Sequence, residues 1–216
     1  GEAICEAFID TEHFRVHYSN DPAHQPPGYP DLQSVYALGA ALEKAYDVHA
    51  ARIQLGQALP DGAAGGGVNL IDCYLYNLRE NGQFGFAMEE EFVPGGCEHA
   101  HNGYMEVSTD LAPFEFSVQM LRTSAHEYHH LVQWGVDPFE SSWFCESTAR
   151  RVEGLVWPEI ENPRGIDEWF FRPQLPLWSE EPYREYSPHF WHFLEATLGD
   201  DILPAIWRRC CDSTWK

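Results

Sequence analysis

The sequence predicts an α+β fold with two lobes. Segments with the patterns of β-strands come before about residue 110, and segments with helical periodicity come after it. Runs of strands followed by runs of helices are typical of α+β proteins, in which helices gather at one face or end of a sheet. With 216 residues, of which 44% are hydrophobic, the chain can form one sizeable domain with its own core.

The first part of the chain carries four predicted strands and one predicted helix. Strands are expected where apolar and polar residues alternate or β-favouring residues cluster, at residues 12–20, 68–78, 82–88 and 102–108. Asp31 stands at the start of a broad apolar stripe, which predicts a capped helix over residues 31–52. Between the first strand and this helix, four prolines and a glycine in residues 21–30 break the chain.

Three further helices are predicted after about residue 110. Apolar residues at steps of three and four, or clear boundary residues, place them at residues 118–132, 140–155 and 187–199. Ser141 or Ser142 is the expected N-cap of the second helix. The third is expected to have Ser187 as its cap and Pro188 in its first turn, and to end at Gly199.

Charge and hydropathy exclude several kinds of partner. The formal net charge of -21 argues against nucleic acid and against an anionic membrane surface, because both select basic faces. No run of about 18 apolar residues is present, so we expect no membrane insertion. A cationic substrate or a crowded extracellular environment fits this charge better, and a monomer is assumed.

The cysteines suggest an oxidising compartment. Six of them are scattered at long spacings without a C-x-x-C pair, at positions 5, 73, 97, 145, 210 and 211. This pattern is more typical of disulfides than of a metal cluster, and it favours a secreted, extracellular or periplasmic protein. Which of the 15 possible pairings forms stays open, and buried free thiols are the alternative.

The segment Thr123–Trp134 concentrates polar chemistry in a helical pattern. His126 and His130 are four residues apart, so they lie on one helix face with Glu127 beside them. This is the H-E-x-x-H arrangement, in which two imidazoles bind Zn²⁺ and the glutamate activates a water molecule. The plainer interpretation is a solvated polar face, but the apolar stripe of the helix lies elsewhere, which favours the metal site. We expect His129 to be a hydrogen-bonded packing residue and not a ligand.

A catalytic zinc site also needs a third protein ligand and an open fourth position. The metzincin continuation is excluded, because Gln133 and Val136 occupy the places of its glycine and histidine. Glu146 is the candidate ligand, since it stands among apolar residues of the predicted helix 140–155 and a zinc ion would compensate its charge. The alternative is an exposed glutamate that pairs with Arg150, four residues further on.

These motifs together resemble the gluzincin clan of zinc metallopeptidases. HEYHH at residues 126–130 is followed by WFCESTA at residues 143–149, which is similar to the W-x-x-E-x-x-A of alanyl-type aminopeptidases. The clan also includes thermolysin-like proteases and secreted bacterial proteases related to immune inhibitor A. The resemblance covers roughly residues 103–199, about half of the chain.

The resemblance implies a zincin-like catalytic domain over residues 1–216. An upper α/β lobe, residues 1–133, would contain a mixed sheet, a backing helix and the zinc-binding helix, and residues 134–216 would form a mainly helical lower lobe. Thermolysin-like enzymes orient a histidine with an aspartate four residues after the glutamate ligand. Arg150 occupies that place here, and Glu153 on the same face is expected to take the role.

The resemblance also implies a donor that stabilises the oxyanion formed during amide hydrolysis. Gluzincins take a tyrosine or a histidine for this purpose from the later helical lobe. Tyr186, just before the third predicted helix, is the first candidate and His189 is the second. The alternative for Tyr186 is simple packing at a helix start.

A peptide substrate is expected to bind in extended form along an exposed strand edge. Residues 102–108 precede the zinc helix and are predicted to be that edge. Four residues there are similar to the G-x-M-E-N strand of the aminopeptidases, with Val107 in place of the asparagine: Gly103, Tyr104, Met105 and Glu106. In those enzymes the glutamate holds the free amino terminus of the substrate. The alternatives are that Glu106 is an ordinary outward-facing residue, or that Glu89 takes its role.

The predicted function is therefore a secreted zinc metalloendopeptidase with Glu127 as general base. One alternative is a zinc aminopeptidase that uses Glu106. Another is a non-catalytic gluzincin-like binding domain. Calcium is possible without support, and His99 and His101 in an acidic loop are more typical of a solvated loop than of a second metal site.

Overall fold

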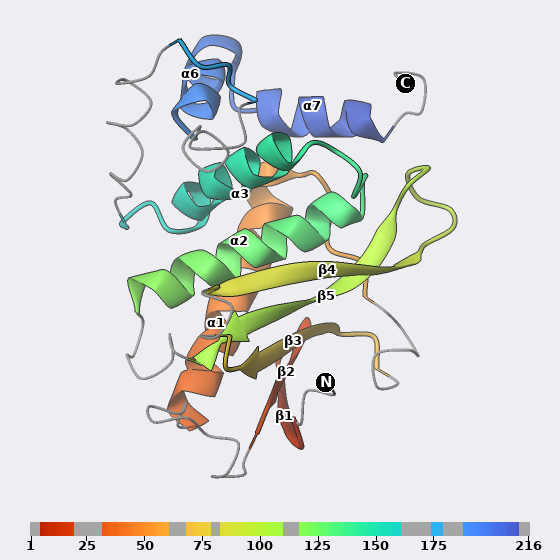
Figure 1. Ribbon diagram of the computed structural model, residues 1–216, viewed down its shortest axis with the longest axis vertical. Helices are drawn as coiled ribbons and strands as arrows, with labels where there is room; N and C mark the ends of the chain where they lie inside the picture. Colours follow the sequence, from red (N-terminus) through yellow and green to blue (C-terminus); the bar gives the residue numbers. More distant parts are fainter. Residues whose placement is uncertain are drawn as a thin grey trace.

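The computed structural model describes residues 5–19, 32–60, 68–78, 83–109, 117–160, 174–178 and 188–211. Its centre is a mixed five-stranded sheet, ordered β1-β2-β3-β5-β4 (Figure 1). The strands are β1 (Ala7–Asp10), β2 (Phe14–Tyr18), β3 (Ile71–Tyr76), β4 (Gly85–Phe92) and β5 (His101–Ser108). β2 and β5 both run parallel to β3, whereas β1 and β4 are antiparallel to their neighbours at the two edges.

The helices cover one face of this sheet and build a layer beyond it. They are α1 (Leu32–Val48), α2 (Val118–Trp134), α3 (Ser142–Val156), α6 (Pro188–Leu198) and α7 (Ile202–Cys210). A π-helical turn, His49–Ile53, continues α1. α2 packs on β4, β5 and α1, and α3 packs on the opposite side of α2 (Figure 1). The described residues thus form an α+β fold, as predicted.

The main core lies between the sheet and helices α1 and α2. Side chains of alternate strand residues point to one face, so β2, β3 and β5 each contribute a row of apolar groups to it. The fully or almost fully buried members are Phe14, Val16, Ile71, Cys73, Leu75, Met105 and Val107 from the strands and Leu38, Leu42, Ala125 and Tyr128 from the helices. Burial of this apolar face fixes α2 against the sheet.

Aromatic side chains join α3 to α6 and α7. The Phe144 and Trp207 rings stack with their centroids 4.4 Å apart, and the centroid of Trp191 lies 5.7 Å from that of Phe144. The indole N–H of Trp191 donates a hydrogen bond to Ser147 Oγ, 3.0 Å away. Large buried rings of this kind supply much of the packing energy between these helices.

The predicted elements are confirmed where they fall on described residues, but two were missed. β1 has only four residues, too few for an alternation pattern to stand out. α7 contains Pro204 and lies in a stretch for which no element was predicted. The proline stands in the first turn of the helix, where its missing N–H has no intrahelical partner to lose. The expected caps Asp31 and Ser187 lie outside the described residues.

The prediction that residues 102–108 form the sheet edge is wrong. β5 lies between β3 and β4, and β4 is the edge strand on that side. Local alternation does not reveal strand order. Here the outer strand, β4, comes earlier in the sequence, and β5, which follows it, lies between β3 and β4. The free edge nearest to α2 is therefore Gly85–Phe92.

The expected set of disulfides is confirmed for one pair. Cys97, in the β4–β5 connection, is bonded to Cys211 at the end of α7, which closes a loop of 114 residues. The other cysteines of the described residues, Cys5, Cys73, Cys145 and Cys210, are free thiols, so a complete disulfide framework is not present. No helix in the described part of the chain is long and apolar enough to cross a membrane.

Gly103 has a steric role between β5 and β4. A Cβ atom at this position would overlap the carbonyl oxygen of Met88 on the neighbouring strand. We expect Gly103→Ala to lower the free energy of unfolding by about 1–3 kcal/mol, because the backbone of β4 has to move. The midpoint of thermal unfolding should fall by about 2–4 °C per kcal/mol.

Gly154→Ala is the matched control for this change. Gly154 lies within α3, and its Cβ would meet only Arg151 Nη1 at an ordinary 3.5 Å. Removing a helical glycine should raise stability by up to about 1 kcal/mol. Equal melting midpoints for Gly103→Ala and the unmodified chain would contradict the steric account.

Candidate metal centre

The three histidines of α2 are buried, so the helix face that carries His126 and His130 is not a solvated polar surface. Ser117 Oγ caps the helix by accepting a hydrogen bond from the Met120 amide, 3.0 Å away. Because α2 lies between the sheet and α3, His126 keeps only 8% of its surface exposed and His130 only 6%. Buried imidazoles need partners, and those partners come mainly from α3.

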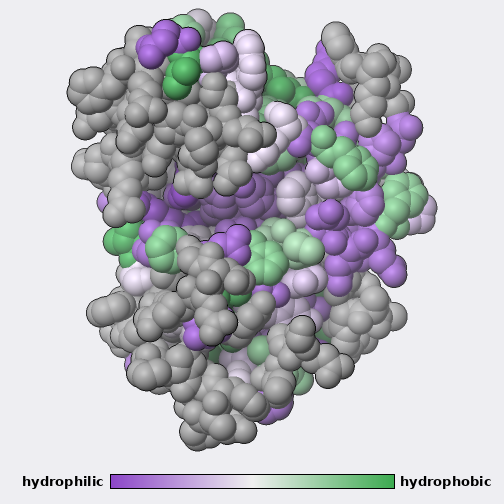
Figure 2. Space-filling view, viewed as in Figure 1, coloured by the Kyte–Doolittle hydropathy of each residue, from purple (hydrophilic) through white to green (hydrophobic). Residues whose placement is uncertain are grey.

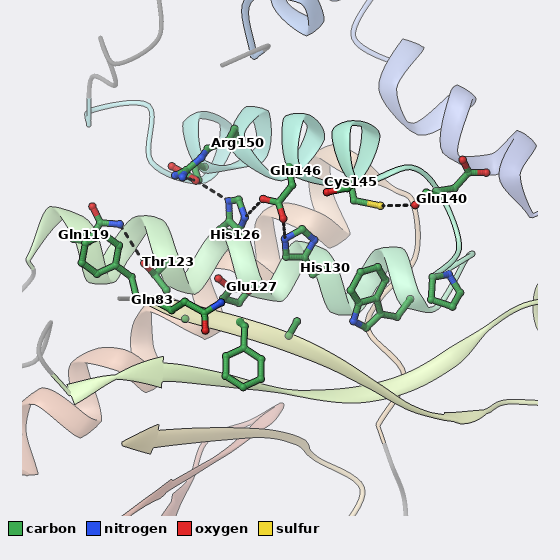
Figure 3. A pocket seen from close by; sticks show the side chains of 18 residues that line it. Gln83, Gln119, Thr123, His126, Glu127, His130, Glu140, Cys145, Glu146 and Arg150 are labelled. Carbon is green, nitrogen blue, oxygen red and sulfur yellow. Dashed lines mark hydrogen bonds and ion pairs between the residues drawn. The ribbon is translucent and has the colours of Figure 1, made fainter. Parts of the chain in front are cut away.

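α3 brings Glu146 to both histidines. Its N-cap is Ser141, whose side chain accepts from the Phe144 amide, and the carboxylate of Glu146 projects from the next turn toward α2 (Figure 3). Glu146 Oε2 is 3.2 Å from His126 Nε2, and Oε1 is 3.9 Å from His130 Nε2. The expected alternative, a pair between Glu146 and Arg150, is not what the structure shows, since Arg150 binds Glu153.

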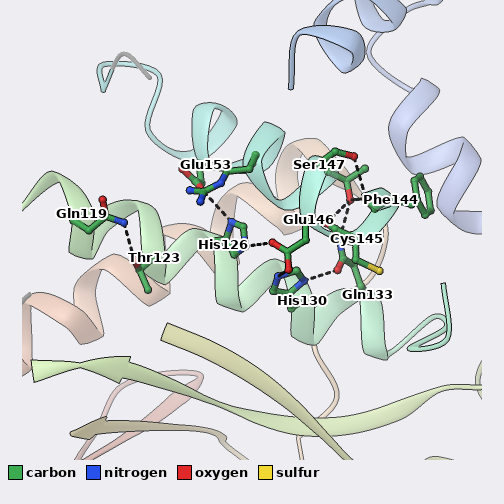
Figure 4. A network of polar contacts seen from close by, with 12 residues as sticks. Gln119, Thr123, His126, His130, Gln133, Phe144, Cys145, Glu146, Ser147 and Glu153 are labelled. Atoms are coloured by element: carbon green, nitrogen blue, oxygen red, sulfur yellow. Dashed lines mark hydrogen bonds and ion pairs between the residues drawn. The ribbon is translucent and has the colours of Figure 1, made fainter. Parts of the chain in front are cut away.

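His126 and His130 each form a second hydrogen bond, from the ring nitrogen that faces away from Glu146 (Figure 4). His126 donates from Nδ1 to Glu153 Oε1 at 2.8 Å, the contact that the sequence predicts for Glu153. His130 donates from Nδ1 to Gln133 Oε1 at 2.7 Å. These bonds turn both Nε2 atoms toward Glu146, and in the neutral ring the proton held on Nδ1 leaves the lone pair on Nε2.

Gln133 is a site residue that sequence reasoning missed. Its amide nitrogen donates to the Cys145 carbonyl at 3.0 Å and to Thr148 Oγ1 at 2.9 Å, which ties the back of His130 to α3. The position was considered only as one where metzincins have glycine. Its spacing of three residues after His130 places it on the same helix face, and this was the available signal.

The donor set fits a divalent metal ion. One nitrogen from each histidine and one oxygen from Glu146 all lie within 4.8 Å of one another. Tetrahedral ligands about 2.1 Å from a zinc ion are themselves ~3.4 Å apart, close to the 3.2 and 3.9 Å measured here. Within the described ranges this is the one group of three such residues that could hold a metal, so His99 and His101 do not form a second site there.

The two histidines have opposite charge preferences without a metal. Burial disfavours a charge on His126, but hydrogen bonds to Glu146 and Glu153 outweigh this and raise its pKa to about 10. Burial, together with the charge on His126, lowers the pKa of His130 to about 4. At neutral pH His130 is therefore a neutral ligand, while His126 has to lose a proton before it binds a metal.

Glu127 lies between the ligands and the edge strand (Figure 3). Burial raises its pKa to about 7, although the charges of His126 and Arg150 oppose the shift. Gly85 lets β4 approach closely, because a Cβ there would be 3.0 Å from Glu127 Cγ and 2.6 Å from Thr123 Cγ2. The carboxylate is therefore a buried base held at the floor of an open site.

A cavity of about 570 Å³ contains this cluster. Its described lining comes from β4, from α2 and from α3 with the segment before it, and it includes the three candidate ligands and Glu127. In the space-filling view, hydrophilic side chains line a hollow that crosses the middle of the face (Figure 2). The volume is in the range of ordinary ligand-binding clefts.

Other predicted site residues lie away from the cluster. Met105 is fully buried in the core, and Glu106, its neighbour in β5, must point to the opposite face of the sheet from α2. Tyr104 shares that opposite face, where its ring contacts Tyr74. Glu106 therefore cannot hold a substrate amino terminus beside the histidines. Glu89, the other candidate for that role, is an exposed residue of β4 and does not line the described cavity.

Of the two candidates for the oxyanion donor, only His189 lies among the described residues. Tyr186 lies outside the described residues, and its role stays a prediction. His189 is in the first turn of α6 and is not part of the described cavity lining. His129 is a packing residue, as expected, in contact with His49 and Trp207. The expected hydrogen bonds are absent, because neither of its ring nitrogens has a partner in the described structure.

No protein-family model, curated protein or solved structure matches the chain. Its function has to be inferred from the residues in the cleft.

Metal binding is expected to release about one proton at pH 8. His126 is protonated below its raised pKa of about 10, and only the neutral ring can be a ligand. His130, with its low pKa, has no proton to release at that pH. Calorimetric titration with Zn²⁺ in buffers of different ionisation enthalpy gives the number of protons directly.

Glu153→Gln is the informative variant for this titration. It removes one of the two carboxylates that raise the pKa of His126, so fewer protons should be released. Affinity should fall by about 10- to 100-fold, as for other outer partners of metal-bound histidines. Binding of Zn²⁺ to the unmodified chain without proton release would contradict the proposed ligand set.

Proposed function

We propose that the protein is a zinc-dependent metalloendopeptidase with a zincin-like arrangement of its sheet and helices. The observation that carries this proposal is the convergence of His126, His130 and Glu146 in one cleft, with the buried carboxylate of Glu127 beside them. Two histidines and a carboxylate are a typical ligand set for catalytic zinc, and a purely structural site has no use for a neighbouring base.

The residues would divide the work of hydrolysis among them. His126, His130 and Glu146 would hold a zinc ion, which when bound supplies Lewis-acid chemistry to a water molecule and a substrate carbonyl. Glu127 would take a proton from the attacking water and deliver it to the leaving amine. Its burial beside the ligands places the carboxylate where it can accept a proton and return it.

The edge of β4 is the proposed place for an extended peptide. Gly85, Phe86 and Ala87 line the cleft opposite α3, and among the strands of the described residues β4 pairs only with β5. A substrate strand could pair with this edge and lie across the cluster by strand addition. The predicted mode of substrate binding is thus kept, but on β4 in place of β5.

The endopeptidase interpretation is favoured over the aminopeptidase one by the position of Glu106. An aminopeptidase needs an acid in the cleft to hold the free amino terminus, and Glu106 faces the other side of the sheet. The disulfide between Cys97 and Cys211 is compatible with secretion, which we include in the proposal.

Cleavage of a doubly blocked peptide tests this function. A long unstructured peptide with an acetylated amino terminus and an amidated carboxyl terminus is incubated with zinc-loaded protein, and the products are identified by mass spectrometry. Internal fragments, absent when a chelator is added, are expected. Removal of residues only from a peptide with a free amino terminus would favour the aminopeptidase alternative. No cleavage of any peptide would contradict both.

A further inference from the structure

Arg150 is a cation fixed at the wall of the cleft. It follows Glu146 by one turn of α3 and lines the same cavity. Its Nη1 donates to Glu153 Oε1 at 2.8 Å. The Glu153 side chain is only 3% exposed, whereas 24% of the Arg150 side chain is exposed, so a buried carboxylate anchors a guanidinium that still reaches the cleft.

The charge of Arg150 is unusual in its surroundings. The chain has a formal net charge of -21, and the described cavity lining contains four glutamates but only this one Lys or Arg residue. Three of the glutamates have other tasks: Glu146 faces the histidines, Glu153 lies behind His126, and Glu127 lies against β4. Arg150 is therefore the one Lys or Arg side chain of the described lining that can attract an anionic group into this cleft.

The cleft is polarised along its length (Figure 3). Arg150 lies at the His126 end, on the same side as the neutral polar residues Gln119 and Thr123. Glu140, the fourth acid of the lining, lies at the opposite end, beyond His130. The Glu140 carboxylate points away from the histidines, toward α7 (Figure 3), so the charge that an extended peptide across the cluster would meet is that of Arg150, at the His126 end.

We propose that Arg150 binds a carboxylate of the peptide substrate at the His126 end of the cleft, and so makes the enzyme selective for acidic peptides. The selectivity in hydrolysis rests on the proposed function, whereas the binding of a carboxylate by Arg150 does not. The carboxylate can come from an aspartate or glutamate side chain near the scissile bond, or from the carboxyl terminus of a short substrate. A planar guanidinium suits either source.

A binding assay separates this proposal from the catalytic one. The zinc-loaded Glu127→Gln chain is titrated into fluorescein-labelled peptides that differ only by Glu or Gln at one position, scanned along the sequence. A second pair differs only in a free or an amidated carboxyl terminus. With Arg150 present, one carboxylate-containing peptide should bind about tenfold more tightly than its neutral partner, as one charge-assisted hydrogen bond allows.

The Arg150→Gln change, made in the same Glu127→Gln background, is the decisive variant. It should reduce the ratio of the acidic to the neutral affinity to about one, while Arg150→Lys should keep part of the selectivity because it keeps the charge. Selectivity in the scanned side-chain series, or only in the terminal pair, identifies the source of the carboxylate.

Two results would overturn the proposal. The first is equal binding of acidic and neutral peptides, or binding of neither, when Arg150 is present. The second is an unchanged ratio in Arg150→Gln with both affinities lowered in proportion, which is the outcome if Arg150 only supports Glu153. If the chain with Glu127 cleaves no peptide but this selectivity is observed, the proposed function fails and the role of Arg150 is supported.

Discussion

Glu127→Gln is expected to lower peptide hydrolysis by about 10²- to 10⁴-fold, the range that a general base contributes. The amide has nearly the shape of the carboxylate, so α2 and the contact with Gly85 should persist, but it cannot accept a proton from water. The initial rate of cleavage of the doubly blocked peptide measures the loss. Zinc content should stay at the level of the unmodified chain, because Glu127 is not among the proposed ligands.

Glu127→Asp is the matched control for this change. It keeps the carboxylate but withdraws it by about one methylene from the attacking water, so activity should lie between the other two chains. Full activity in Glu127→Gln with its zinc retained would contradict the role of Glu127. It would leave a metal site without the proposed chemistry.

Glu146→Ala is expected to remove the metal. It deletes one of three donors, so affinity for Zn²⁺ should fall by more than the roughly 10- to 100-fold that loss of an outer partner costs. Competition with a chromogenic chelator gives the dissociation constant. Peptide cleavage should be lost at limiting zinc.

Glu140→Ala is the control for Glu146→Ala. Glu140 lines the same cavity but is not one of the three grouped donors, so its removal should leave zinc affinity nearly unchanged. Equal zinc affinity in the Glu146→Ala and unmodified chains would exclude Glu146 as a ligand.

Local sequence patterns predicted the elements that carry the candidate site. The spacing of His126 and His130 depends only on helical geometry, and α2 brings them together as expected. Glu146 was selected because acids are costly inside a packed helix, and Glu153 because the resemblance implies an acid on the same face that orients a histidine; both face His126 in the structure. In each case one helix, read alone, holds the necessary information.

The errors arose where the answer depends on several elements together. Strand order places β4 outside β5 and decides the free edge, whereas the packing of the helices on the Met105 side decides the face on which Glu106 lies. Alternation fixes only that Met105 and Glu106 face opposite sides, and not which side faces α2. Gln133 was missed for a related reason, since its role in holding His130 depends on contacts with Cys145 and Thr148 of another helix, α3.

The most direct test of the account is the zinc content of the unmodified chain. Protein purified without added metal and dialysed exhaustively is analysed for its elements, before and after reconstitution with Zn²⁺. The geometry of His126, His130 and Glu146 predicts about one zinc per chain. No bound zinc, even after reconstitution, would mean that the cluster is only a buried hydrogen-bond network, and the peptidase proposal would fail with it.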